Sequence, residues 1–163
     1  MMAQNTSSIS IEHVMHHESL VALIIRANYR SDGIAFFTPD SFSQQLAYMN
    51  RPTGYVIPAH VHNPVHRDVF YTLEVLFIKS GKVRVDFYTT ERDYLESRVL
   101  AGGDVIFLAS GGHGFEMLEP TEMIEIKQGP YAGEQDKTRF PGVQAEHIAI
   151  AADDSRRDGD SGG

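Results

Sequence analysis

Short segments of alternating apolar and polar residues constrain this chain more than any other feature. In residues 82–88, KVRVDFY, the side chains of Val83, Val85 and Phe87 fall on one face of an extended chain and the residues between them on the other. Residues 72–79, TLEVLFIK, are largely apolar on both faces, as expected for a strand that is covered on each side. The pattern predicts an all-β fold of antiparallel strands, either closed or sandwiched. Turn-forming sequences separate such segments at residues 79–81, 90–93, 101–103, 110–112 and 119–120.

The organisation of the chain predicts one folded unit with a tail at each end. Its 163 residues are close to the size of one typical domain. Residues 1–8 are small and polar and are predicted to be a disordered tail. Residues 141–163 end in DDSRRDGDSGG, which has too little apolar surface to order itself, so a disordered tail is predicted there too. Residues 9–140 lie between the tails and contain no internal repeat, which favours one barrel over a tandem pair.

Composition and charge exclude several classes of function. Hydrophobic residues make up 42% and charged residues 22% of the chain, as in an ordinary soluble protein. A net charge of -8 argues against a nucleic-acid binder and against docking on anionic membranes, because both need a basic face. The longest apolar run, residues 20–25, is too short to span a bilayer, and the first residues lack the pattern of a signal peptide. We therefore expect a cytoplasmic protein.

Histidines supply the candidate chemistry of this chain. There are no cysteines, so a bound metal would be held by histidine nitrogen and carboxylate oxygen. His60 and His62 form a His-x-His pair on a predicted strand that ends GYVIPAHVH. Residues i and i+2 of a strand project from the same face, so the two imidazoles can chelate one ion.

The residues around this pair resemble a known family. Gly54 is followed after five residues by His60-Val61-His62, and Glu74 is followed after six residues by Gly81. A second block runs from Gly103 through Ala109-Ser110-Gly111-Gly112 to His113. These blocks resemble the two motifs of the cupin superfamily, Gly-x5-His-x-His-x(3–4)-Glu-x6-Gly and Gly-x5-Pro-x-Gly-x2-His-x3-Asn. The resemblance covers residues 54–117 and implies a single jelly-roll barrel, the double-stranded β-helix.

The resemblance also implies a metal site. Carried over residue by residue, it makes His60, His62, Glu74 and His113 the ligands of one divalent ion. The sequence departs from the motifs in three places. Eleven residues separate His62 from Glu74, one residue is missing before His113 and Ala109 stands for the proline, and Met117 replaces the asparagine. None of these departures removes a ligand.

Three histidines and one glutamate suit Zn, Ni, Mn, Fe or Co. On an octahedral ion, four protein ligands leave two positions for water or substrate, and such an ion can act as a Lewis acid. His66 is a rival to Glu74 as the fourth ligand because it lies nearer to His62 in the sequence. Glu74 is favoured because it keeps its spacing from Gly81 and is the one charged residue in an apolar run, where an unpaired carboxylate would be costly.

Further side chains are candidates for contact with a substrate. His66 and Tyr131 are candidate proton-transfer groups. If Ile124 and Ile126 face the barrel interior, Gln128 ends their row near the mouth, where it would bind a ligand; otherwise it is an ordinary residue at a strand end. The remaining candidates are Tyr48, as a hydroxyl in the pocket, and Arg51, as a partner for an anionic substrate.

The cupin fold hosts many activities, so the fold alone does not give the function. The chain resembles small cupins associated with sugar and surface-polysaccharide metabolism. This resemblance implies a metal-dependent enzyme that isomerises or epimerises a small oxygen-rich substrate such as a sugar or nucleotide-sugar. Two alternatives are an Fe(II) dioxygenase and a protein that binds a metal or small ligand without catalysis.

A homodimer is predicted from the two-faced apolar strand. One barrel covers only one face of residues 72–79 with its own core. The outward set, Leu73, Val75 and Phe77, needs either a second copy or an N-terminal strand such as residues 20–27 as its cover.

Overall fold

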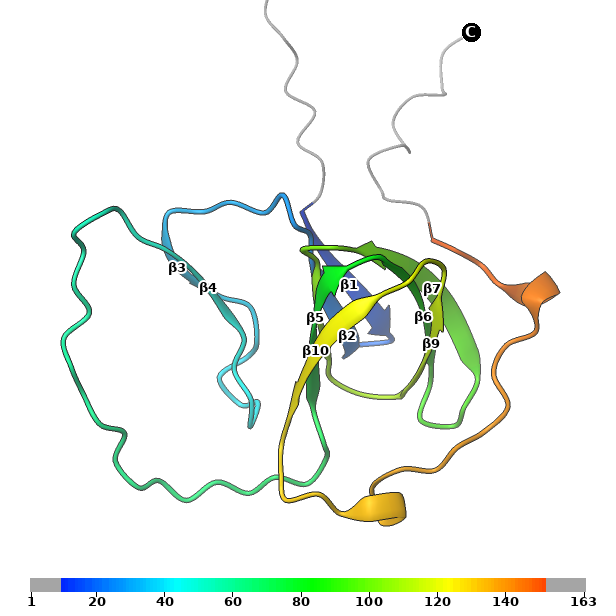
Figure 1. Cartoon of the computed structure of the whole chain (residues 1–163). Helices are drawn as coiled ribbons and strands as arrows, with labels where there is room; N and C mark the ends of the chain where they lie inside the picture. The colour runs from blue at the N-terminus through cyan, green and yellow to red at the C-terminus, as the bar shows by residue number, and fades with distance from the viewer. Residues whose placement is uncertain (1–9, 152–163) are drawn as a thin grey trace, which may run out of the picture. The chain divides into compact units, whose positions relative to one another are not determined.

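The computed structural model describes residues 10–151 and consists mainly of β-strands joined by turns and loops (Figure 1). This confirms the predicted all-β class. The predicted tail at residues 1–8, and residues 152–163 of the other, lie outside the described residues. The elements in chain order are β1 (Ile11–His16), β2 (Ser19–Ile25), β3 (Gly33–Phe36), β4 (Ala47–Asn50), β5 (Glu74–Ser80), β6 (Lys82–Tyr88), β7 (Tyr94–Ala101), β8 (Val105–Leu108), β9 (Gly112–Met117), β10 (Glu122–Lys127) and the short 3-10 helices η1 (Gly133–Asp136) and η2 (Ala145–His147).

The described residues divide into two compact units instead of the single unit predicted for residues 9–140. One unit, the sandwich unit, contains residues 10–28 and 73–151. The other contains residues 29–72. The division follows from strand content: β3 and β4 pair only with each other, and residues 51–73 form no strand.

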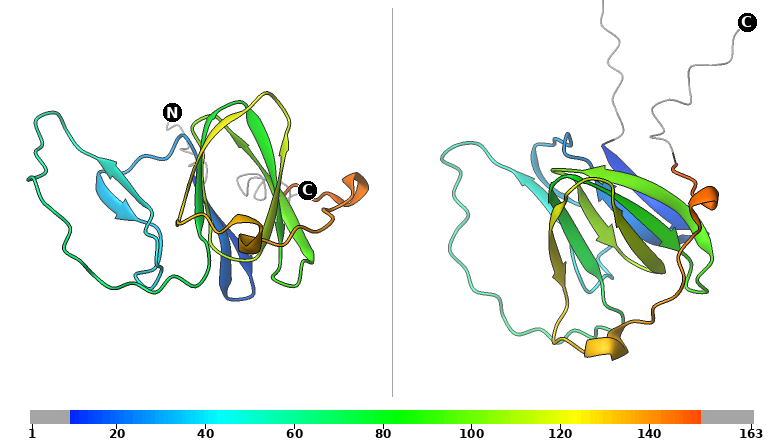
Figure 2. Two further views of the ribbon diagram at one scale, coloured as in Figure 1. Left: turned by 60° about the horizontal axis from the view of Figure 1, so that its bottom comes forward. Right: turned by 45° about the vertical axis from the view of Figure 1, so that its right-hand side comes forward.

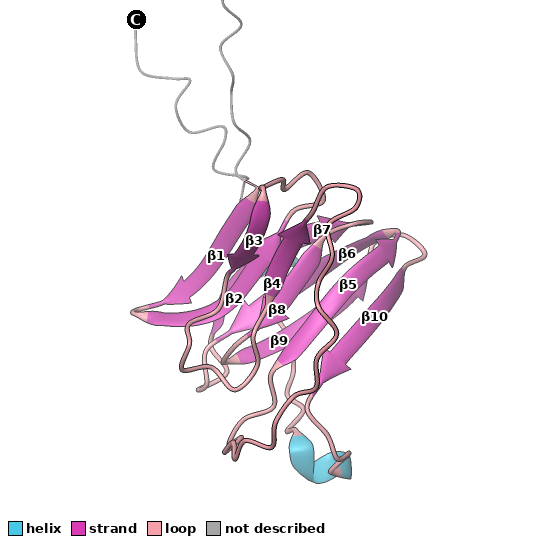
Figure 3. Ribbon diagram, turned by 90° about the vertical axis from the view of Figure 1, so that its left-hand side faces the viewer, coloured by secondary structure: helices cyan, strands magenta, loops and turns pink. Residues whose placement is uncertain are grey.

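The sandwich unit contains two antiparallel sheets (Figures 2 and 3). The larger sheet has the strand order β1-β2-β8-β5-β10, and the smaller has the order β7-β6-β9. Strands β5 and β6 are joined by a tight turn at Gly81, whose positive φ of 86° is a conformation that favours glycine. No ladder joins the two sheets within the described residues, so they form a sandwich.

The core fills the space between these two sheets, and it follows the alternation seen in the sequence. Val83, Val85 and Phe87 of β6 are fully buried in it, as predicted. Leu76 and Ile78 of β5 face them from the larger sheet. The other buried members of this cluster are Val14, Val21, Ala22, Ile24, Leu100, Ile106 and Leu108.

Strand β5 is central in the larger sheet, with β8 on one side and β10 on the other. Leu76 and Ile78 on one face are buried in the core, and on the other face Val75 is buried and Phe77 is 37% exposed. The N-terminal strand expected as a cover for Val75 and Phe77 lies elsewhere. Strand β2 pairs edge to edge with β8 inside the same sheet, so it does not lie over the outer face of β5. A homodimer that covers this face stays a prediction.

Residues 140–151, the C-terminal strap, lie against the smaller sheet. Ser97 of β7 donates its backbone N–H to the carbonyl of Ala149 at 2.9 Å and accepts the N–H of Ala151 at 3.0 Å. The tyrosine hydroxyl of Tyr88 accepts the N–H of Val143, and that of Tyr94 accepts the N–H of Ala149, each at 2.9 Å. Residues 141–151 therefore differ from the disordered tail predicted for them. The prediction counted apolar burial alone, whereas this segment is held by backbone hydrogen bonds to the edge of a sheet.

In the other unit, β3 and β4 form a two-stranded antiparallel ribbon, with Ala35 opposite Tyr48. The loop between them is tied by side chains. Thr38 donates its hydroxyl to the amide oxygen of Gln45 at 3.0 Å, and Gln45 donates to the carbonyls of Pro39 and Phe42.

Candidate metal centre

Two of the four predicted ligands meet inside the sandwich unit. Glu74 is the first residue of β5 in the larger sheet, and His113 lies in β9 of the smaller sheet. Nε2 of His113 lies 3.2 Å from Oε2 of Glu74, and the two side chains are 29% and 15% exposed. His113 stands opposite Phe87 in the ladder of β6 and β9, so it shares the inner face of its sheet with a core residue. The packing of the two sheets therefore joins two residues that are distant in the sequence.

The surroundings of Glu74 favour its ionised form. The hydrogen bond from His113 lowers the pKa of the Glu74 carboxyl group below its ordinary value, and this outweighs burial, which raises it. The charges of His113 and Lys127 lower the pKa further. Nζ of Lys127 lies 3.8 Å from Oε1 of Glu74. The site therefore presents an anionic oxygen beside an imidazole nitrogen.

The other two predicted ligands, His60 and His62, belong to the unit of residues 29–72. Their rings pack edge to face with centroids 5.3 Å apart, and Nδ1 of His60 donates to the carbonyl of Pro58 at 2.8 Å. The prediction of a strand that ends in GYVIPAHVH is wrong, because residues 55–62 form a loop. A strand needs a ladder partner, and proline at position 58 has no N–H to donate to one.

The predicted ligands thus appear as two pairs, one in each unit. Among residues 10–151, no three His, Asp or Glu side chains converge in a way that could hold a metal ion.

The residues predicted to touch a substrate are scattered. The predicted role of Gln128 depended on Ile124 and Ile126 facing the interior. This condition is not met, because both residues lie on the outer face of β10 and are half exposed. Met123 of the same strand packs against the core. The amide oxygen of Gln128 accepts the backbone N–H of Leu73 at 2.7 Å, and its Nε2 is buried without a partner among the described residues.

Of the other four candidates, three make local contacts and the fourth, Tyr131, is exposed. Tyr48 packs edge to face against Tyr29, with ring centroids 5.0 Å apart. The guanidinium group of Arg51 lies over the ring of Tyr55 at 4.6 Å. His66 is exposed and lies 3.0 Å from Asp68, and Tyr131 is exposed.

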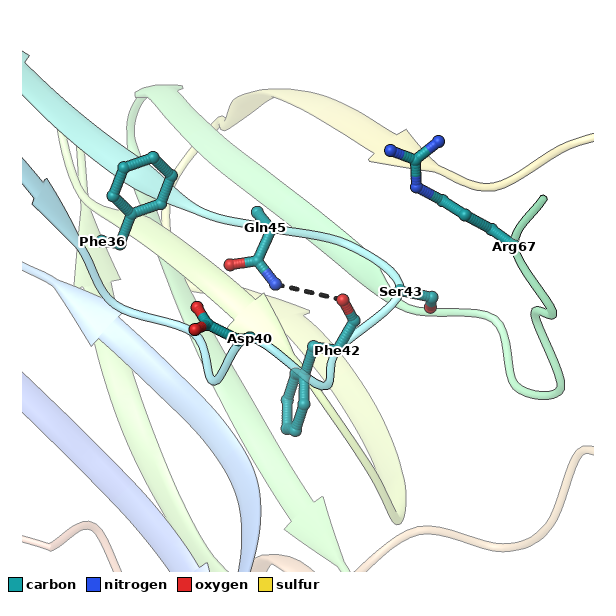
Figure 4. Close-up of a pocket in the computed structure, with 6 residues that line it drawn as sticks. All are labelled: Phe36, Asp40, Phe42, Ser43, Gln45 and Arg67. Carbon is teal, nitrogen blue, oxygen red and sulfur yellow. Dashed lines mark hydrogen bonds between the residues drawn. The ribbon is translucent and has the colours of Figure 1, made fainter. Parts of the chain in front are cut away.

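Sequence reasoning missed two features. Lys127 lies beside Glu74, and the sequence had not indicated it as a candidate residue. The second feature is a cavity of about 400 Å³ within the unit of residues 29–72, which no motif indicated (Figure 4). It holds none of the predicted ligands, and its lining residues are Phe36, Asp40, Phe42, Ser43, Gln45 and Arg67.

Comparison with known proteins identifies no relative. No family model, curated protein or solved structure matches the chain. Among the described residues, no helix has the length and apolar character needed to cross a membrane.

Proposed function

We propose that this chain is a metal-dependent cupin that isomerises or epimerises a small oxygen-rich substrate such as a sugar or nucleotide-sugar. In this proposal, Glu74, His113, His60 and His62 hold one divalent ion. The observation that carries it is the contact of 3.2 Å between Glu74 and His113, two residues that the cupin motifs separately name as ligands.

The architecture supports a jelly roll. Two antiparallel sheets face each other around one core, and most of their neighbouring strands are far apart in the sequence, as in β2-β8, β8-β5 and β5-β10. Such crossed connections are typical of Greek-key sandwiches and jelly rolls.

The donor chemistry of the two pairs fits a first-row divalent ion. An ionised carboxylate beside imidazole nitrogen suits Zn, Ni, Mn, Fe or Co, and the chain has no thiolate to compete. When bound, such an ion supplies a Lewis acid that polarises a carbonyl or hydroxyl oxygen. Glu74 and His113 are partly buried, so they would keep bulk water from one side of a bound ion.

The decisive measurement is metal content by elemental analysis of protein purified without an affinity tag. We expect about one equivalent of ion in the wild type, and its loss in Glu74→Gln and His60→Ala. The matched control is His66→Ala, because His66 is exposed and paired with Asp68. Thermal melting of each variant separates loss of the metal from loss of the fold.

Loss of the ion in His66→Ala with full retention in Glu74→Gln would show that the ligand set is wrong. The reaction is tested by incubating the loaded protein with neutral sugars and nucleotide-sugars, with oxygen uptake measured in parallel. Isomerised or epimerised product without oxygen uptake is expected. Oxygen consumption by an iron-loaded protein would identify a dioxygenase instead.

A further inference from the structure

Lys127 extends the Glu74–His113 pair into a cluster of three functional groups. Lys127 is the last residue of β10 and stands directly opposite Glu74 in the ladder between β10 and β5. Its Nζ lies 3.8 Å from Oε1 of Glu74 and 3.3 Å from Oε1 of Glu125. The side chain is only 26% exposed. An ammonium group is therefore held beside the proposed metal ligands.

The wall of this cluster is apolar on the side of β9. Phe115 is two residues from His113 in β9, so the two side chains share the inner face of this strand. The rings of His113 and Phe115 are 5.3 Å apart. Apolar side chains near an ionic group reduce its screening by water, which strengthens its attraction for a group of opposite charge.

The charges of the cluster change sign when a divalent ion is added. With His113 neutral, as a metal ligand must be, the acidic Glu74 and Glu125 and the basic Lys127 give a formal sum of minus one. Lys137 and Asp136, which also act on these groups, cancel each other. A divalent cation at Glu74 brings the sum to plus one. The loaded site then attracts an anion, and Lys127 is the one lysine or arginine paired with Glu74 among the described residues.

We propose that Lys127 binds an anionic oxygen group of the substrate, a carboxylate or a phosphate, beside the metal ion. This rests on the proposed metal site and deepens it, because it restricts the substrate to an anion and excludes a neutral sugar. Lys127 is thus a residue that determines specificity, and neither the motifs nor the spacing of the sequence had named it.

The test uses the full chain loaded with one equivalent of Co²⁺, whose visible spectrum reports changes at the ion. Oxalate and inorganic phosphate are titrated separately by calorimetry, so that the carboxylate and phosphate sources are told apart. The variants are Lys127→Met, Lys127→Arg and, as matched control, Lys79→Met. Lys79 lies in β5 and makes an exposed ion pair with Glu122 of β10. Metal content is measured before and after each titration.

We expect the loaded wild type to bind at least one of the two anions and the metal-free protein to bind neither. Lys127→Met should weaken that binding about tenfold with its metal content unchanged, and Lys127→Arg should restore most of it. Lys79→Met should match the wild type. Equal anion affinity in the wild type and Lys127→Met, or no anion binding by the loaded wild type, would overturn the role of Lys127 while the metal site stands. Failure of the wild type to take up the ion would overturn the metal site and this inference with it.

Discussion

The two edges of the smaller sheet differ in their cover. Strand β7 forms one edge, and the C-terminal strap pairs with it through Ser97. Strand β9 forms the other edge and has β6 as its one ladder partner among the described residues. The exposed fractions of side chains on the inner face of the smaller sheet show the same difference. Leu100 of β7 is 0% exposed, whereas Phe115 and Met117 of β9 are 36% and 47% exposed.

This contrast separates a structural edge from a candidate functional edge. At the β7 edge, a chain of hydrogen bonds runs from Ala149 through Tyr94 and Ser97 to the carboxylate of Asp86, which also binds Arg84 through two nitrogens. Each of these groups therefore has a hydrogen-bond partner within the chain of bonds. The β9 edge carries His113, which faces Glu74 and leaves one side of the pair accessible. A ligand can approach only where the sandwich is open, so the uncovered edge is where binding is expected.

The largest effect that can test this comparison comes from truncating equivalent inner-face residues at the two edges. Leu100→Ala leaves a cavity in a fully buried site and should lower the free energy of unfolding by about 4 kcal/mol. Met117→Ala removes a half-exposed side chain and should cost less than about 1 kcal/mol. Denaturant unfolding followed by circular dichroism measures both. A cost at Met117 equal to that at Leu100 would mean that the β9 edge is covered in solution, and the comparison would break.

Removal of the strap tests the other edge. A chain that ends after Phe140 loses the backbone and tyrosine hydrogen bonds of residues 141–151 and leaves Ser97 without its edge partners. Its free energy of unfolding should fall by about 3 kcal/mol, since each lost bond contributes about 1 kcal/mol or less. A chain that ends after Ala151 keeps these bonds and is the matched control. Equal melting temperatures for the two truncated chains would show that the strap does not stabilise β7.

A smaller effect is expected from Asp86, the end of the hydrogen-bond chain. Burial raises the pKa of its carboxyl group, but hydrogen bonds from Arg84 and Ser97 outweigh it and keep the pKa below the ordinary value of 3.8. Because the folded-state pKa is depressed, the stabilisation is fully present above the unfolded value and is lost as pH falls through the folded one. Asp86→Asn should cost about 2 kcal/mol at pH 7.

Urea unfolding at pH 7 and at pH 2 measures the dependence on pH. The difference between the wild type and Asp86→Asn should shrink at the lower pH, where the wild-type carboxylate becomes protonated. A difference that stays constant between the two pH values would contradict the role of the Asp86 charge and would leave only the shape of the side chain as its contribution.

The sequence alone was enough for the strand pattern and for half of the proposed centre. Alternation in residues 82–88 predicted that Val83, Val85 and Phe87 share one face, and all three are buried in the core. Alternation is a local property of an extended chain, so it can be recognised in the sequence without knowledge of the fold. The cupin-like spacing named Glu74 and His113, which lie in contact.

Tertiary structure decided the rest, because each remaining question concerned a partner distant in the sequence. Alternation in residues 122–127 defines two faces, but both contain apolar residues, and only packing against β5 shows that Met123 and Lys127 face inward. The strap is ordered by the unpaired edge of β7, which composition cannot reveal. Residues 55–62 have the composition of a strand but form a loop, since a strand exists only where another chain segment supplies its hydrogen bonds.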